Sequence, residues 1–380
     1  MSDDTKKPAN HEPAVINNVA VAVIHHKEQY LLGFRHAAQH QGNRYEFVGG
    51  KIDANESAEQ AVIREVAEET GIAIQDNVMV KLGRLHHDYG DKQVSLAVYK
   101  IELTAAQYEQ YKSCQCGLEG QALAWVDKGD LLAEKYPLPA ANKTILTWLS
   151  LPTNIAITYP LSHFSVHPDP AAAWLQYHQQ TLAAETWVYI RIKDTGAKHL
   201  ATQLLHLRPD ILAIVPEQDE SQSLTTEDSI KTPEVHAHEQ IVAKHLTHSA
   251  LMQWFDSNFN DNFDSNKNAL ASDQLLSHDY PLHDCPLIVS CHDTASIQAA
   301  NKLACIRLQQ QRPPVIAAFL SPVLATQTHP DTEPLGWAAW SALAQLADIP
   351  IIGLGGLSPA MSDQALAHGG VGVAGIRQFL

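Results

Sequence analysis

Apolar and polar residues follow two different rhythms in the first part of the chain. Short runs such as VAVAVIHH, QYLLGFR, VSLAVYKIEL and LAWVD combine β-branched and aromatic residues at strand-like spacing. Among them lies one long stretch, SAEQAVIREVAEET, in which the apolar residues recur at the spacing of a helix. The pattern predicts an α/β domain with a mixed sheet over residues 17–150.

A second pattern begins at residue 155. From there on, apolar strand-like runs alternate with helical ones, and eight runs are apolar enough for a sheet buried on both faces: IAITYP, WVYIRIK, ILAIVPE, IVAKHLT, LIVSCHD, VIAAFLSPV, PIIGLGG and VGVAGI. This count predicts a (βα)8 barrel over residues 155–380. Residues 151–154, in which Pro152 and Asn154 interrupt the helical run NKTILTWL, predict a linker.

Polar segments break the rhythm in three places. Residues near 218–239 and 256–284 are rich in Asp, Asn, Ser and His and poor in apolar residues. Because such segments bury too little apolar surface to pack, we expect them to be surface insertions of the barrel. Residues 1–16 are polar as well, and we expect a flexible N-terminus.

The chain is acidic, with a formal net charge of −16 over 380 residues. This argues against binding of polymeric nucleic acid, which normally requires a basic face. No apolar run approaches the roughly 18 residues that a membrane span needs, and the N-terminus lacks the apolar segment of a signal peptide. The five cysteines contain no CxxC pair and suit a reducing compartment. We therefore expect a cytoplasmic protein that binds small molecules, with its oligomeric state left open.

The predicted helix carries three closely spaced acids. Glu65, Glu68 and Glu69 fall at positions i, i+3 and i+4, so their carboxylates project from one face. Ser57 is a good N-cap, and Gly71 ends the helix. Like charges at this spacing repel unless a cation lies between them. Oxygen ligands of this kind suit Mg²⁺, with Mn²⁺ as the other candidate, and these ions activate water for attack on phosphorus.

The same segment resembles the box of the Nudix family, whose fixed positions are a glycine, a glutamate, an arginine–glutamate pair, an aliphatic residue, two further glutamates, a second glycine and a closing aliphatic residue. All of them are matched, by Gly50, Glu56, Arg64, Glu65, Val66, Glu68, Glu69, Gly71 and Ile72. The resemblance implies an α/β/α sandwich that hydrolyses a pyrophosphate bond with a divalent metal. The other interpretation of the segment is a solvated acidic helix capped by glycine.

Further segments resemble the MutT group of this family. Glu119 occupies the place of a fourth metal-binding glutamate, although an exposed loop glutamate is the simpler interpretation. The run Glu46–Lys51 matches the turn that leads into the box, with Val48 in place of the usual proline. Asn142, in Leu-Pro-Ala-Ala-Asn, stands where MutT proteins read the oxidised purine, and it could also cap the following helix. Substrate contacts are implied at Arg35, Phe47, Gly49, Gly50 and Asn142.

The MutT resemblance implies a reaction and a set of roles. A nucleoside triphosphate, 8-oxo-dGTP, would be hydrolysed to the monophosphate and pyrophosphate. This reaction would remove oxidised nucleotides from the pool and so limit mutation, a role in DNA repair and replication. Metal ions would be held by Glu65, Glu68, Glu69 and Glu119, with Glu65 or Glu119 as general base. Arg64 would pair with Glu56 or Glu65 and orient the acids. Two alternatives stay open: another nucleotide or a thiamine-pathway diphosphate as substrate, and a non-enzymatic sensor of phosphorylated ligands.

The barrel region resembles thiamine phosphate synthase and TenI proteins. The resemblance rests on SCHD, LSPVL, LGW, GLGG and GVAGI, and it implies a phosphate site that uses Arg191, Lys193, Gly355, Gly356 and Gly375. Tyr189 stands where active synthases have glutamine, and no Asn-Asp metal pair follows the third strand. The Thr-Lys of the sixth loop is also missing, so we expect a degenerate barrel that binds a phosphorylated ligand. The alternative is a bifunctional enzyme.

Overall fold

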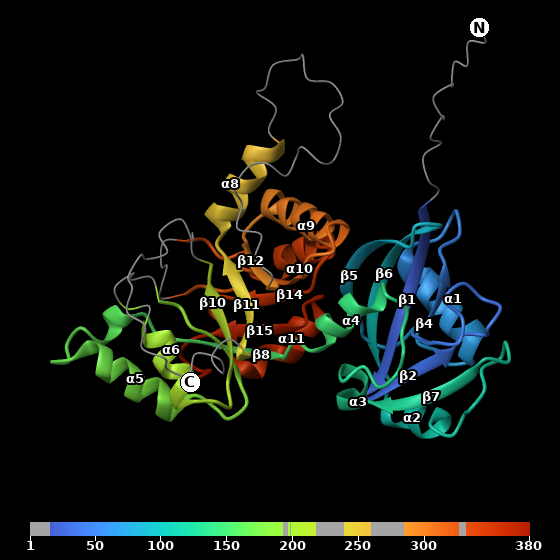
Figure 1. The fold of residues 1–380 in the computed structure, drawn as a ribbon, viewed down its shortest axis with the longest axis horizontal. Coiled ribbons are helices and arrows are strands. Elements are labelled where there is room, and N and C mark those ends of the chain that lie inside the picture. The colour runs from blue at the N-terminus through green and yellow to red at the C-terminus, as the bar shows by residue number, and fades with distance from the viewer. Residues whose placement is uncertain (1–15, 193–196, 198, 218–238, 260–284, 327–331) are drawn as a thin grey trace, which may run out of the picture.

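The computed structural model describes residues 16–192, 197, 199–217, 239–259, 285–326 and 332–380. These residues form two domains, an N-terminal sandwich and a C-terminal barrel (Figure 1). In the part of the chain that is described, no helix is both long enough and apolar enough to cross a membrane. The predicted flexible N-terminus lies outside the described residues except for Ile16, which begins the first strand.

The N-terminal domain is built on a mixed seven-stranded sheet. Its main path runs β3-β2-β1-β6-β5, with β4 paired to β1 and β7 paired to β2. β1 and β6 are parallel, and the other pairs are antiparallel. The strands are β1 (Ile16–His26), β2 (Gln29–Phe34), β3 (Tyr45–Glu46), β4 (Val48–Lys51), β5 (Met79–Asp88), β6 (Gln93–Glu102) and β7 (Ala122–Asp127).

Helices cover both faces of this sheet. α1 (Ala58–Thr70) buries Ala61, Val62 and Val66 against one face, in a core shared with Ile24 and Ile101. On the other face, α3 (Lys128–Leu132) and α4 (Asn142–Leu149) enclose a second core that includes Leu32, Leu85 and Trp148. The short α2 (Ala105–Tyr111) lies at the sheet's end. The predicted α/β/α sandwich with a mixed sheet is therefore confirmed.

Eight parallel strands close the second domain into a barrel, in the order β10-β11-β12-β13-β14-β15-β8-β9. Each of the eight apolar runs seen in the sequence supplies one strand, so the predicted (βα)8 fold is confirmed. The strands are β8 (Asn154–Ile157), β9 (Trp187–Tyr189), β10 (Leu212–Pro216), β11 (Ile241–Leu246), β12 (Leu287–Cys291), β13 (Val315–Leu320), β14 (Ile351–Leu354) and β15 (Gly372–Gly375).

Helices surround the barrel, whose interior is filled by side chains such as Ile155, Ile214 and Phe319. The helical segments are η1 (Leu161–Phe164), α5 (Pro170–Thr181), α6 (His199–Leu207), α8 (His248–Phe259), α9 (Thr294–Gln309), α10 (Gly336–Leu346), η4 (Pro359–Met361) and α11 (Ser362–Ala367). The second polar stretch, predicted from residue 256, overlaps the last turn of α8. Its remainder and residues 218–238 of the first stretch lie outside the described residues.

The connection between the domains is packed rather than free. α4 ends at Leu149 and β8 begins at Asn154, so only residues 150–153 join the two folds. Leu151 is buried in the core of the barrel, and the Thr153 carbonyl accepts a hydrogen bond from Val373. Figure 1 shows α4 between the sheet and the barrel. The predicted linker region therefore joins the domains without slack.

Candidate active site

The acidic helix α1 is well defined at both ends. Ser57 accepts a hydrogen bond from Gln60 N–H, and the Gln60 side chain accepts one from Ser57 N–H, which completes a capping box. Gly71 ends the helix in the left-handed conformation, with φ of 76°. Because the apolar side is pinned to the sheet, the side that carries Glu65, Glu68 and Glu69 is presented at a fixed angle.

Arg64 lies among three carboxylates. Its Nη1 donates to Glu65 at 2.8 Å and to Glu68 at 3.0 Å, and its Nε donates to Glu56 at 3.2 Å. Its Nη2 also donates to the Lys51 carbonyl, so the guanidinium ties the helix to the end of β4. Arginine's planar fork suits such multiple contacts. Arg64 therefore holds both acids of the Glu56 and Glu65 pair that the sequence offered as alternatives.

Glu69 is the centre of an acid cluster. Burial, and after it the neighbouring carboxylates of Glu46, Glu65 and Glu119, raise its pKa to about 8. Hydrogen bonding to the Gly49 backbone acts in the opposite direction. Three other carboxylates therefore lie close enough to the half-buried Glu69 to disfavour its charged form. Glu46 was missed at the sequence level because it joins the cluster through strand pairing with Gly33, not through helical spacing.

The Glu46 carboxylate forms an ion pair with Arg35. Burial raises the pKa of Glu46, and the ion pair with Arg35 opposes that rise. Arg35 itself is fixed by a hydrogen bond from its Nε to the His40 carbonyl at 3.1 Å. The predicted substrate-contacting arginine thus lies between the acid cluster and the loop that holds His40.

Gly50 lets α1 approach the sheet closely, and its neighbour Gly49 contacts an acid of α1 through its backbone. Gly50, paired with Ala20, sits against the Glu65 carboxylate, which a Cβ at this position would strike. Gly49, next to it, hydrogen-bonds to Glu69 through its backbone. The structure therefore places both predicted substrate-contacting glycines against the acids.

The loop that carries Glu119 is fastened to the end of α1. Leu118 N–H donates to the Glu69 carbonyl at 2.7 Å, and Gln121 Nε2 donates to the same carbonyl at 3.2 Å. A Cβ on Gly117 would stand 2.5 Å from this carbonyl oxygen, so glycine allows the close approach. The Glu119 carboxylate is exposed, and it is near enough to raise the pKa of Glu69.

The cluster has the donors for a hard divalent ion, but they are not gathered around one point. Among the residues that the structure describes, no three His, Cys, Asp or Glu side chains enclose a metal position. The reason is visible in the ion pairs: Arg64 holds Glu65 and Glu68, and Arg35 holds Glu46. The carboxylate-only donor set and the raised pKa of Glu69 nevertheless fit Mg²⁺.

Asn142 lies at the beginning of α4 and is 7% exposed. The residue before it, Ala141, is the N-cap, and no side-chain hydrogen bond caps this helix. The capping role considered for Asn142 is therefore wrong, because Asn142 is already the first helical residue. Tyr89, from the turn between β5 and β6, hydrogen-bonds through its hydroxyl to the Ala141 backbone.

Other side chains around Tyr89 form an aromatic and basic neighbourhood. Its ring lies 4.4 Å from the His87 ring and 4.9 Å from the His40 ring, edge to face. Arg35 and Arg44 are close enough to lower its pKa against the larger effect of burial. Phe47 is only 4% exposed and belongs to the same core cluster as Ala141. Arg35, which pairs with Glu46 of the acid cluster, thus also lies near Tyr89.

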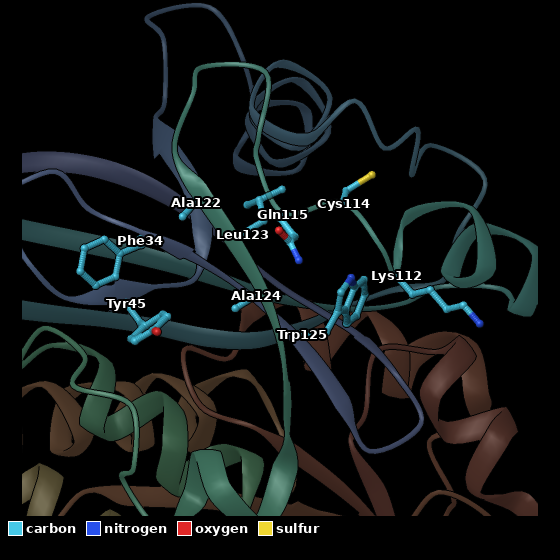
Figure 2. Close-up of a pocket in the computed structure, with 9 residues that line it drawn as sticks. All are labelled: Phe34, Tyr45, Lys112, Cys114, Gln115, Ala122, Leu123, Ala124 and Trp125. Carbon is cyan, nitrogen blue, oxygen red and sulfur yellow. The ribbon is translucent and has the colours of Figure 1, made fainter.

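An open pocket of about 650 Å³ lies elsewhere, along the edge strand β7. Figure 2 shows Phe34 and Tyr45 on one side of this strand and Lys112, Cys114 and Trp125 on the other. None of the residues predicted for substrate or metal lines it. The pocket therefore does not define the site that the sequence predicts.

The barrel residues predicted for phosphate have mixed positions. Arg191 is half-buried, and its N–H donates to Thr158 Oγ1 at 2.9 Å. Lys193 lies outside the described residues. Gly355 and Gly356 have positive φ and pack against Pro322 and Leu324. The ring of Phe379 lies against Gly375, where a Cβ would stand 2.5 Å from it.

A buried polar chain crosses the barrel next to Arg191. The Tyr189 hydroxyl and His245 Nδ1 are 2.8 Å apart, and His245 Nε2 and Ser290 Oγ are also 2.8 Å apart. Burial lowers the pKa of His245 to about 3. Tyr189, at the position where synthases have glutamine, is therefore part of a satisfied network inside the barrel.

The comparisons with known proteins agree with this architecture. A family model described as NUDIX domain matches residues 19–148, and one described as Thiamine monophosphate synthase matches residues 285–379. The 8-oxo-dGTP diphosphatase of Escherichia coli strain K12 is 31% identical over 132 residues, which are 34% of this chain and 94% of that protein. The CTP pyrophosphohydrolase of the same organism is 31% identical over 128 residues, 34% of this chain and 87% of that protein.

Among solved structures, the MutT NUDIX hydrolase from Burkholderia pseudomallei is 24% identical and covers 35% of this chain and 96% of its own, with a TM-score of 0.28. The Escherichia coli diphosphatase is matched over nearly its whole length. The chain therefore belongs to the Nudix hydrolase family through a MutT-like N-terminal domain, and this domain is joined to a barrel that is similar to thiamine monophosphate synthase over residues 285–379.

Proposed function

We propose that this protein hydrolyses 8-oxo-dGTP to 8-oxo-dGMP and pyrophosphate with Mg²⁺, as a sanitiser of the nucleotide pool. The observation that carries the proposal is the acid cluster around Glu69, where burial and the neighbouring carboxylates of Glu46, Glu65 and Glu119 raise the pKa of Glu69 beside the Nudix box. The similarity to 8-oxo-dGTP diphosphatases of Escherichia coli and Haemophilus influenzae supports the substrate.

Glu65, Glu68, Glu69 and Glu119 would hold the metal. When bound, Mg²⁺ neutralises the phosphate chain and lowers the pKa of the attacking water. Arg64, which hydrogen-bonds to Glu56 and to the Lys51 carbonyl, would orient the acids. Glu65 or Glu119 would take the proton from water, and Arg35, which is paired with Glu46, would contact the substrate's phosphates.

Base recognition falls to Asn142. Its amide offers one donor and one acceptor, which match the O6 acceptor and N7–H donor of 8-oxoguanine. Ordinary guanine has acceptors at both positions, so it would leave one amide group facing a like partner.

The substrate is tested by measuring pyrophosphate release with Mg²⁺ from 8-oxo-dGTP, dGTP, CTP and a thiamine-pathway diphosphate. We expect kcat/KM to be highest for 8-oxo-dGTP, and Asn142→Ala to reduce that preference by roughly 10-fold or more, since an unpaired polar group costs about 1–3 kcal/mol. CTP is included because a CTP pyrophosphohydrolase is similarly close in sequence. Equal rates for 8-oxo-dGTP and dGTP in the wild type would remove the substrate assignment.

The metal model is tested separately with Glu69→Gln. The amide keeps the size of the side chain and removes a ligand charge, so turnover of every substrate should fall at least about 100-fold. Glu109→Gln is the matched control, because Glu109 is exposed on α2 and pairs with Lys112. Full activity of Glu69→Gln at low Mg²⁺ concentration would show that the cluster does not hold the metal.

For the barrel we propose a ligand-binding role without synthase activity. Tyr189 stands in place of the expected glutamine, and its hydroxyl hydrogen-bonds to His245. A phosphorylated ligand would contact Arg191 and the Gly355-Gly356 turn. Incubation with the aminopyrimidine and thiazole substrates of a synthase should yield no thiamine phosphate, and product formation would favour the bifunctional alternative.

A further inference from the structure

The two domains touch at a bulge in the edge strand of the sandwich. β5 pairs with β6 irregularly between Lys81 and Gly83, and the loop after α10 docks there. The Arg84 N–H donates to the Asp348 carbonyl at 3.0 Å. A Cβ on Gly83 would stand 2.5 Å from that carbonyl oxygen and 2.9 Å from the Trp148 ring. The contact therefore requires glycine at this position.

Charged side chains complete the contact. Lys81 Nζ donates to the Gln345 carbonyl at 3.0 Å and lies 3.6 Å from Asp348 Oδ1, while Arg84 Nε lies 3.8 Å from the same oxygen. The Lys81 side chain is only 13% exposed. Burial lowers its pKa, and the Asp348 carboxylate opposes that effect. One carboxylate of the barrel thus balances two cations of the sandwich.

Hydrogen bonds within the barrel fix the loop that carries Asp348. Asp348 N–H donates to Asn301 Oδ1 at 2.8 Å, and Asn301 Nδ2 donates to the Leu346 carbonyl at 2.9 Å, so both sides of the loop are tied to α9. Leu308 of α9 also packs against the core that contains Leu82 and Leu85. The docking surface is therefore part apolar and part polar, with fixed geometry on the barrel side.

Tyr89 follows β5 and Asn142 begins α4, and the opposite end of each of these two elements touches the barrel. β5 runs from the bulge to Asp88, and the next residue, Tyr89, hydrogen-bonds to the Ala141 backbone. α4 begins at Asn142, contacts the barrel strand β13, and carries Trp148, whose ring faces Gly83, in its last turn. The acids, by contrast, are held by α1, β4 and the Glu119 loop, which supply none of the contacts described above.

We propose that the barrel, through Asp348 and the close approach at Gly83, is a positioning part of the Nudix site that fixes Tyr89 and Asn142 for recognition of the base. The inference rests on the proposed function for the identity of that base. Its consequence is that loosening the contact weakens nucleotide binding and base discrimination, while the chemical step at the acid cluster continues.

The test uses Asp348→Lys in the full chain, with Asp363→Lys as matched control on the exposed side of α11. Asp348→Lys sets a third cation against Lys81 and Arg84. We expect KM for 8-oxo-dGTP to rise about 5-fold or more and its preference over dGTP to fall, with kcat within about two-fold of wild type. Adding Lys81→Asp to Asp348→Lys should restore KM, because the charges are then exchanged.

A second, steric variant and a measurement without turnover complete the test. Gly83→Ala should loosen the contact through the added Cβ. In both variants, hydrogen exchange should become faster at the amides of Tyr89 and Asn142, which donate to the Lys92 and Pro139 carbonyls at 2.9 Å. Unchanged KM and exchange in both variants would overturn the inference, and so would a fall in kcat with KM unchanged. If the wild type does not prefer 8-oxo-dGTP over dGTP, the proposed function is wrong. The amide exchange rates and KM for dGTP still test whether the barrel positions Tyr89 and Asn142.

Discussion

Single residues set how close the acids of this site come to the sheet. Glu65 packs against Gly50, where any side chain would displace its carboxylate, and Glu69 receives hydrogen bonding from the Gly49 backbone. Gly50 therefore has a steric role that is independent of substrate binding. Its lack of a side chain defines where the Glu65 carboxylate lies.

We predict that Gly50→Ala lowers kcat by at least about 10-fold without unfolding the domain, because a displaced carboxylate is a flexible group and the backbone there is not in a left-handed conformation. Activity with Mg²⁺ and urea unfolding would be measured together. Gly33→Ala is the control: it makes the same change in the same sheet, where a Cβ would meet nothing closer than 4.0 Å. Equal activity of the two variants would show that the position of Glu65 is not limiting.

At the scale of elements, the capping box of α1 determines where the acid-bearing helix begins. Ser57→Ala should lower the free energy of unfolding by about 1 kcal/mol, the usual value of an N-cap, as measured by urea unfolding. Thr104→Ala removes the same kind of cap from α2 and should cost a similar amount. The two should differ in activity: the first should raise the Mg²⁺ concentration for half-maximal rate, because α1 carries the acids. A shared loss of Mg²⁺ affinity would contradict this.

The elements could be predicted from sequence where a single periodicity dominates. Parallel strands buried on both faces, such as β13, read as continuous apolar runs, and the box fixed the spacing of the acids on α1. Contacts between distant segments could not be predicted in this way. Glu46 reaches the cluster through pairing of β2 with β3, and Tyr89 reaches Ala141 through the β5–β6 turn. The docking of Asp348 on β5 has no local signal at all.

At the scale of the whole molecule, both domains bury neutral histidines. Burial lowers the pKa of His25 and His178 to about 4 and that of His245 to about 3. His178 is fixed at both ring nitrogens, since Nε2 accepts from Tyr159 N–H at 3.0 Å and Nδ1 lies 2.8 Å from the Trp174 carbonyl. Protonation would break the first of these contacts.

These buried histidines make the free energy of unfolding depend on pH. Below pH 6.5 the unfolded chain takes up protons at these histidines, whereas the folded chain does so only near pH 4. The free energy of unfolding should therefore fall as the pH falls through this window, and Tm should be roughly 5 °C lower at pH 5 than at pH 7. His178→Gln should show a shallower slope in calorimetry, and the exposed His206→Gln an unchanged one. A Tm that does not change from pH 7 to pH 5 would contradict the prediction.

The docking of the barrel on β5 also decides what happens when the chain is shortened. A protein cut after Ser150 would lose the Asp348 carbonyl that accepts from Arg84 N–H, together with the apolar cover of Leu308 and Val371. An edge strand that is left uncovered can pair with the strand of another molecule. We therefore expect the isolated N-terminal third to self-associate more readily than the full chain, as light scattering of the two proteins would show.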